Sequence, residues 1–271
     1  AASKRIEGGS PLATALKETL VFAIALAVGA IPEGLPAVVT IALAIGVQRM
    51  ARRNAIIRRL PAVETLGSTT VICSDKTGTL TCNEMTVTEL VTLKQSVRIS
   101  GIGYEPKGTL THDGQALPAL PGDIEELLRA AVLCNDAGLH QGSAGWNING
   151  DPTEAALLVA AAKAGMAQEA VNNRWPRLDV IPFASETQSM LTLHGGEGCI
   201  AVLKGAPEVV FQHCLEASDE SIHQQVVAAM HRLGAGGMRV LALATMNWPE
   251  GELLPAVVPS SDFRFLGLIG M

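Results

Sequence analysis

The chain has 271 residues, a formal net charge of −6 and a hydrophobic content of 48%. An acidic chain in which aromatic residues make up only 3% is poorly suited to bind phosphate backbones or to stack on single strands, so no nucleic-acid partner is predicted. The five cysteines are scattered and form no CxxC pair, which argues against a disulfide scaffold and a zinc site.

Residues 1–19 are predicted to lead into a membrane from its extracytoplasmic side. From residue 20 to residue 47 the chain is apolar, apart from an interruption at residues 32–36. At about 1.5 Å per residue, this stretch spans about 40 Å as a helix, which is enough to cross a bilayer. A buried helical hairpin in a soluble core is the alternative. Five arginines between residues 49 and 59, with no acid among them, favour a membrane helix whose cytoplasmic flank begins near Gln48.

The interruption reads Pro32-Glu33-Gly34-Leu35-Pro36. Two prolines remove backbone donors, so we expect the helix to unwind here and to free carbonyl oxygens. Irregular backbone at membrane depth is tolerated where it lines a cavity or a site. Freed carbonyls together with one carboxylate form half of an oxygen site for a hard cation. The sequence therefore predicts a broken transmembrane helix in which Glu33 is a candidate cation ligand.

A second candidate site follows an apolar, β-branched run at residues 69–73, which ends in Ser74 and Asp75. Such a run predicts a buried parallel strand that delivers a carboxylate to the carboxyl edge of its sheet, where ligands bind. A carboxylate held there can act as a covalent nucleophile, and Lys76 and Thr77 supply charge and hydrogen-bond donors for a phosphoryl group. The alternative is an aspartate that only caps a turn.

Residues 75–81, Asp-Lys-Thr-Gly-Thr-Leu-Thr, resemble the phosphorylation motif of P-type cation-transporting ATPases, a branch of the haloacid-dehalogenase-like superfamily. The resemblance implies that Asp75 takes the γ-phosphoryl group of ATP and that Lys76 contacts the phosphate. It also implies that Asp75 and Thr77 bind Mg²⁺, Thr77 through its backbone carbonyl. Many phosphatases of the superfamily carry a second aspartate at the position of Thr77, and its absence is typical of an enzyme whose phosphoenzyme persists.

The interrupted apolar stretch resembles the fourth transmembrane helix of calcium-type members of this family. The resemblance implies that Glu33 provides a carboxylate ligand to the transported cation, and that Val28, Gly29 and Ile31 provide carbonyl oxygens. It favours Ca²⁺ or a similar ion such as manganese, and it leaves sodium open. Residues 48–68 resemble the cytosolic stalk of the family, and residues 69–85 are predicted to begin the phosphorylation domain, which is Rossmann-like.

From residue 86 to residue 271 the pattern predicts an α+β domain. Residues 90–99 are typical of a β-hairpin, and residues 123–135 of an amphipathic helix. Asp151-Pro152-Thr153-Glu154 provides an N-cap, a proline at the first helical position and an acid in the first turn, which predicts the start of a helix. On these residues alone, Glu154 is explained equally well as part of a helix start.

The same resemblance implies an ATP site in this domain. It places Glu154 beside the adenine, Phe183 stacked on it, Lys204 and Gly205 at the floor of the pocket, and Arg239 on the phosphates. Without the resemblance, Phe183 is better explained as a core residue. Many relatives also carry a basic residue near Gln188, and this chain has none there. No Walker A motif occurs, so ATP must be bound without a P-loop.

The expected fold class is therefore an α/β and α+β multidomain membrane-protein fragment: a broken transmembrane helix, the start of a Rossmann-like phosphorylation domain, and an antiparallel-sheet nucleotide-binding domain with flanking helices. The expected function is ATP-driven cation export in the plasma membrane, with ATP and Mg²⁺ as cofactors and membrane lipid around the helix. Several family segments are absent from the chain, so we expect it to need the remainder of the same pump for turnover. The alternatives are a haloacid-dehalogenase-like phosphatase and a stand-alone nucleotide-binding module.

Overall fold

The computed structural model of the protein describes residues 11–82, 84–143, 145–259 and 262–271. These residues form two compact units, which divide between Ser74 and Asp75. Each unit is described below by itself. Of the entry segment predicted at residues 1–19, residues 1–10 lie outside the described residues.

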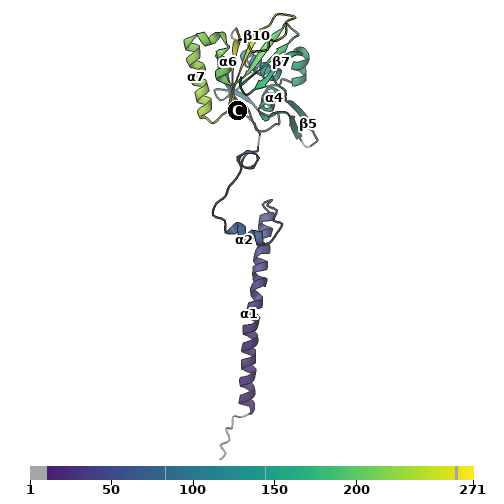
Figure 1. The fold of residues 1–271 in the computed structure, drawn as a ribbon, viewed down its shortest axis with the longest axis vertical. Coiled ribbons are helices and arrows are strands. Elements are labelled where there is room, and N and C mark those ends of the chain that lie inside the picture. The colour runs from purple at the N-terminus through teal and green to yellow at the C-terminus, as the bar shows by residue number, and fades with distance from the viewer. Residues whose placement is uncertain (1–10, 83, 144, 260–261) are drawn as a thin grey trace, which may run out of the picture. The chain divides into compact units, whose positions relative to one another are not determined.

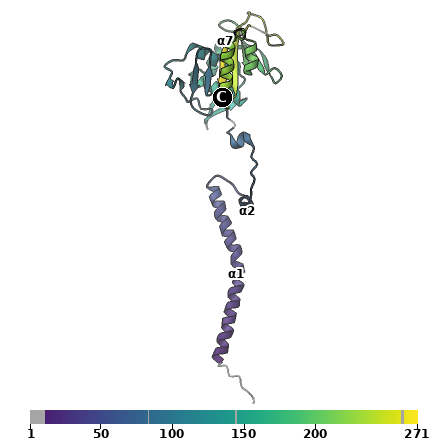
Figure 2. The same cartoon turned by 90° about the vertical axis from the view of Figure 1, so that its left-hand side faces the viewer.

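The first unit consists of two helices, α1 (Pro11–Ala51) and α2 (Pro61–Gly67). The prediction of a break at residues 32–36 is wrong, because α1 runs through both prolines. Figure 2 shows that α1 bends part-way along its length. A proline removes only its own N–H, so the carbonyls of Val28 and Pro32 lose their intrahelical donors while the hydrogen bonds on either side persist. The result is a kinked helix rather than an unwound one.

The length and composition of α1 fit a membrane span. It is 41 residues long, and residues Leu12–Ala51 have a mean hydropathy of 1.9 in their most apolar window. At about 1.5 Å per residue the helix measures about 60 Å, roughly twice the hydrocarbon thickness of a bilayer. A core helix of a soluble protein passes the same test but is mostly buried, whereas none of the described residues in this window is buried. A signal sequence passes the test too, so the finding concerns the length and composition of the helix.

The segment around Asp75 does not form the predicted strand. Residues 69–75 are extended or irregular, and Val71 and Ile72 are 76% and 87% exposed. A buried strand needs hydrogen-bonded neighbours on both sides, and the strand pairings that the structure describes begin only at Glu89. The Rossmann-like start is therefore not confirmed. Lys76–Leu80 instead form a short π-helical turn directly after Asp75.

The second unit is built on an antiparallel sheet of nine strands in the order β4-β3-β2-β1-β11-β10-β9-β8-β7. The predicted hairpin is confirmed as the first two strands. Two further strands form a separate hairpin, β5 (Gly138–Gly142) and β6 (Gly145–Asn149). The strands of the large sheet are β1 (Glu89–Val91), β2 (Ser96–Ile99), β3 (Leu110–His112), β4 (Gln115–Ala116), β7 (Arg177–Ala184), β8 (Ser189–His194), β9 (Ile200–Gly205), β10 (Val240–Asn247) and β11 (Arg264–Gly270).

Helices cover both faces of this sheet (Figure 1). On one face lie α3, α4 and α5, and on the other α6 and α7. Alternate residues of β9 show why both faces are apolar: Val202 belongs to the core under α3 and α4, whereas Ala201 and Leu203 belong to the core under α6 and α7. The helices are α3 (Gly122–Leu133), α4 (Pro152–Lys163), α5 (Gln168–Arg174), α6 (Pro207–Gln212) and α7 (Glu220–Ala235), with a 3₁₀ turn at Leu215–Ser218.

Candidate functional site

Glu154 lies in the first turn of α4, where the sequence predicts it. The Asp151 side chain accepts hydrogen bonds from the backbone N–H groups of Thr153 at 2.7 Å and of Glu154 at 3.3 Å, so the predicted N-cap is confirmed. Burial alone would raise the pKa of Asp151, but these hydrogen bonds and the nearby Arg239 hold it below its ordinary value. The cap is therefore charged at neutral pH, and it fixes the turn that carries Glu154.

Lys204 brings a buried cation to Glu154. It lies near the end of β9 and is only 5% exposed. Its Nζ lies 2.6 Å from Glu154 Oε1, and it also donates to the backbone carbonyl of Cys134. A lysine is rarely buried unless it is paired, so the burial and the pairing explain each other. Two residues that stand fifty positions apart and were predicted to share one site are thus in direct contact.

The residues that follow α3 complete this cluster, and sequence reasoning did not identify them. The backbone N–H of Asp136 donates to Glu154 Oε2 at 3.0 Å, and the Asn135 side chain donates to the Glu154 carbonyl at 2.9 Å. The guanidinium group of Arg177, at the start of β7, lies 2.5 Å from Asp136 Oδ1. Nothing local in the sequence indicates these contacts, because they join segments more than fifteen residues apart.

Phe183 lies on β7 at the level of Lys204. Ser189 of β8 pairs with Ala184 on one side and with Gly205 on the other. Phe183 and Lys204 precede these two partners, so they lie at the same end of the sheet with β8 between them, about 10 Å apart at the usual strand spacing. The Phe183 side chain is 59% exposed. The interpretation of Phe183 as a core residue is therefore not supported, and its ring is open to a ligand.

Gly205 is required by the close approach of two strands. A Cβ atom added to it would lie 2.3 Å from the Gln188 carbonyl oxygen and 2.8 Å from Ser189 Cα. The N–H of Ala206 donates to that same carbonyl at 2.9 Å, which holds the β7–β8 turn against the end of β9. The glycine thus shapes the site without a side chain of its own.

Arg239 lies beside the start of α4 and is exposed. Its Nη1 lies 3.4 Å from Thr153 Oγ1, and its backbone N–H and carbonyl pair with Met271 at the end of β11. Four of the predicted residues, Glu154, Lys204, Gly205 and Arg239, are therefore held around the α4 start and the end of β9. Phe183 faces solvent at the same sheet end.

The structure describes the Asp75 segment through its backbone. Asp75 is extended, with φ −67° and ψ 145°, and the turn after it contains Gly78 at φ +74° and a hydrogen bond from Thr81 N to Lys76 O at 3.2 Å. The side chains of Thr77, Ile31 and Glu33 lie outside the described residues. Among the side chains that are described, no three His, Cys, Asp or Glu gather as a metal site. The roles of Asp75, Lys76 and Thr77 therefore remain predictions.

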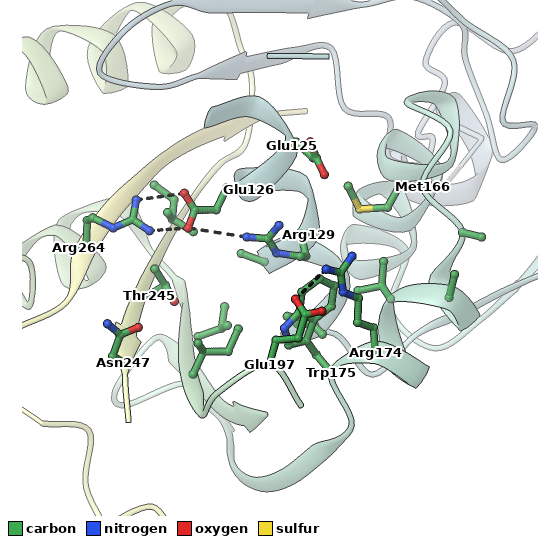
Figure 3. Close-up of a pocket in the computed structure, with 18 of the residues that line it drawn as sticks. Glu125, Glu126, Arg129, Met166, Arg174, Trp175, Glu197, Thr245, Asn247 and Arg264 are labelled. Carbon is green, nitrogen blue, oxygen red and sulfur yellow. Dashed lines mark hydrogen bonds and ion pairs between the residues drawn. The ribbon is translucent and has the colours of Figure 1, made fainter. Parts of the chain in front are cut away.

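A separate cavity of about 620 Å³ lies on the α3 face at the opposite end of β9. Figure 3 shows its two ion-paired groups. Arg264 and Arg129 share Glu126, and Arg174 lies 2.7 Å from Glu197 and 4.6 Å from the centre of the Trp175 ring. None of the predicted site residues lines this cavity.

Comparison with known proteins identifies the second unit. Residues 123–271, more than half of the chain, match the family described as P-type ATPase, cytoplasmic domain N. The chain belongs to the P-type ATPase family. The matched residues run from α3 to β11 and so include Glu154, Phe183, Lys204 and Arg239. This match confirms the predicted family, and the strand pairings of the large sheet confirm the predicted antiparallel domain.

Three curated relatives cover most of the chain. It is 46% identical over 277 residues to "Cation-transporting ATPase pma1" of Synechocystis, with 97% of this chain and 30% of the relative covered. It is 48% identical over 239 residues to "Probable cation-transporting ATPase F" of Mycobacterium tuberculosis, covering 83% and 26%. It is 36% identical over 261 residues to "Calcium-transporting ATPase" of Bacillus subtilis, covering 92% and 29%. The chain thus spans less than a third of the length of these relatives.

Proposed function

We propose that this chain supplies the nucleotide-binding domain, the phosphorylation motif and one membrane helix of an ATP-driven cation pump. The observation that carries the proposal is the buried contact between Lys204 and Glu154, beside the exposed Phe183 ring. An aromatic face and a carboxylate held by a buried lysine suit the adenine end of ATP, because a ring stacks on the base and a carboxylate accepts from its amino group. Relatives named cation-transporting ATPases support the same function.

We further propose that Asp75 accepts the γ-phosphoryl group. One carboxylate oxygen of Asp75 would form the new bond to phosphorus while the bond to the bridging oxygen of ADP breaks, and ADP leaves with that electron pair. Lys76 would contact the transferred phosphoryl group. The Asp75 carboxylate and the Thr77 carbonyl are hard oxygen donors on one short segment, which fits Mg²⁺. When bound, Mg²⁺ neutralises charge between the carboxylate and the phosphates.

The transport half of the proposal rests on α1. We propose that α1 crosses the plasma membrane with residues from Gln48 onward in the cytoplasm, and that Glu33 and the carbonyls of Val28, Gly29 and Ile31 contribute to a cation site. Because Pro32 has no N–H, the Val28 carbonyl lacks its intrahelical hydrogen-bond donor even in the kinked helix. Its oxygen is therefore free to coordinate a cation. Ca²⁺ is favoured, as the name of the Bacillus subtilis relative indicates for that protein. Manganese and sodium are the other candidates.

Titration of the chain with ATP by calorimetry tests the nucleotide half. We expect saturable binding of one ATP. Phe183→Ala should weaken it by about 1–3 kcal/mol, the range for the loss of an aromatic that stacks on a base. Lys204→Ala should weaken it as well. Phe183→Tyr keeps the ring and serves as the matched control. Unchanged affinity in both alanine variants would remove these residues from the site.

A further inference from the structure

Two cationic side chains from different strands bind the segment that leaves α3, residues 133–137, here called the α3 exit segment. Arg177 Nη2 donates to the carbonyls of Leu133 at 3.1 Å and of Asn135 at 2.6 Å, while Lys204 donates to the carbonyl between them, that of Cys134. The last carbonyls of a helix lack intrahelical donors and carry partial negative charge, so cations are stabilised there. The exit segment is therefore held by cationic donors from two strands, β7 and β9.

The same segment links Arg177 to Glu154. Arg177 Nη1 lies 2.5 Å from Asp136 Oδ1, and Asp136 N donates to Glu154 Oε2 at 3.0 Å. The other oxygen of Glu154 lies 2.6 Å from Lys204. The four charged groups thus form a row in which the carboxylates of Asp136 and Glu154 lie between two cations, Arg177 at one end and Lys204 at the other. Both carboxylates have a cation as a direct partner, which offsets the repulsion between them.

We propose that Arg177 is a positioning residue of the nucleotide site, which holds the α3 exit segment so that Glu154 stays aimed at the base; this rests on the proposed function. Without the guanidinium group, two carbonyls lose their donor and Asp136 loses its counter-ion. The N–H that fixes Glu154 Oε2 then moves with the segment. Lys204 alone restrains the other oxygen, so the carboxylate can rotate away from the base.

A purely structural role predicts a different result. An arginine that only caps a helix stabilises the domain, and its loss lowers the binding affinity for every ligand of that domain equally. An arginine that acts through Glu154 also changes base preference. A carboxylate accepts a hydrogen bond from the 6-amino group of adenine, whereas hypoxanthine presents a carbonyl oxygen at that position. The ratio of the affinities for ATP and ITP therefore reports the position of Glu154.

The experiment measures ATP and ITP binding to the full chain by calorimetry, with the fold checked by tryptophan fluorescence. The variants are Arg177→Ala, Arg177→Lys and Glu154→Ala. Arg174→Ala is the matched control, because it removes the same charge at a position three residues before Arg177. Arg174 is paired with Glu197, and both of these side chains are more than half exposed. We expect Arg177→Ala to weaken ATP binding about tenfold and to lower the ratio of ATP affinity to ITP affinity toward the ratio of Glu154→Ala. Arg177→Lys should restore part of the ATP affinity. Arg174→Ala should change the ATP affinity less than twofold.

The double variant Arg177→Ala/Glu154→Ala should bind ATP no more weakly than Glu154→Ala alone, because both substitutions remove the same interaction, that between Glu154 and the base. Equal losses for ATP and ITP, or an additive double variant, would overturn the positioning role. If Arg177→Ala does not fold, the same ratio measured on Arg177→Lys decides the question. If the wild-type chain binds neither nucleotide, the proposed function fails, and this role falls with it.

Discussion

At the scale of single residues, His194 ties the stability of the second unit to pH. It lies at the end of β8, is 1% exposed, and its Nδ1 lies 3.1 Å from the Trp175 carbonyl oxygen. Burial lowers the pKa of His194 to about 4, and the charge of the nearby Arg177 acts in the same direction. The folded state therefore keeps this imidazole neutral where the unfolded chain binds a proton.

We predict that the free energy of unfolding falls as pH falls from 6.5 to 4 through this residue. The folded-state pKa lies below the ordinary value of 6.5, so the unfolded state binds more protons in this window. The full loss is about 3 kcal/mol, at about 1.4 kcal/mol per pH unit. Urea unfolding followed by tryptophan fluorescence measures it, since Trp146, Trp175 and Trp248 all belong to the second unit.

His194→Gln should flatten this pH dependence, because it keeps a donor for the Trp175 carbonyl and removes the ionisation. His140→Gln is the matched control, since His140 is exposed on β5 and its replacement should leave the slope unchanged. A His194→Gln protein with the wild-type slope between pH 6.5 and pH 4 would show that other groups cause the acid sensitivity.

At the scale of elements, the contact between β8 and β9 decides the shape of the nucleotide site. The register places Ser189 opposite Gly205 and Met190 opposite Lys204. A side chain at position 205 would push the Gln188 carbonyl away and separate the strands at the point where Lys204 turns toward Glu154. The glycine, the turn before β8 and the buried ion pair thus depend on one another.

We predict that Gly205→Ala lowers the free energy of unfolding by about 1–3 kcal/mol, because the added Cβ meets backbone atoms that cannot rotate away. Gly234→Ala in α7 is the control of opposite sign. A Cβ there meets nothing within 4 Å, so alanine should be neutral or stabilise the domain by up to about 1 kcal/mol. Urea unfolding of both variants checks this. Equal stabilities of the two would mean that β8 shifts freely.

The elements with local signals could be predicted from the sequence. The helix at residues 123–135 is found as α3, and the cap at Asp151 starts α4, because both depend on neighbours within one turn. The strand predicted at residues 69–73 is wrong, since a strand also needs partners that local pattern cannot supply. Arg177 was missed for the same reason: its contacts lie 41 to 44 residues away in the chain.

At the scale of the whole molecule, the two compact units separate the proposed roles. The nucleotide residues Glu154, Phe183 and Lys204 belong to the second unit, and Glu33 belongs to α1 in the first. Ligand binding within one compact unit depends on the contacts of that unit. A change in α1 should therefore alter ion dependence without altering ATP affinity, whereas a change at Lys204 should alter ATP affinity directly.

We predict the effect of Glu33→Gln in the complete pump. The transported cation should no longer activate phosphoryl transfer from ATP to Asp75, while ATP affinity stays within about twofold of wild type. The carboxamide keeps the size of the side chain and removes its charge. The loss of charge weakens the binding of a hard divalent cation, while the unchanged size leaves the helix little disturbed. The assay incubates membranes with γ-labelled ATP and Mg²⁺ across a series of calcium, manganese or sodium concentrations, quenches with acid and counts the bound label. Asp75→Asn is the blank. Glu18→Gln, which removes the same charge from the same helix, is the matched control and should keep the wild-type response. If all three ions activate the Glu33→Gln pump as they activate wild type, Glu33 is not a ligand and the cation site lies elsewhere.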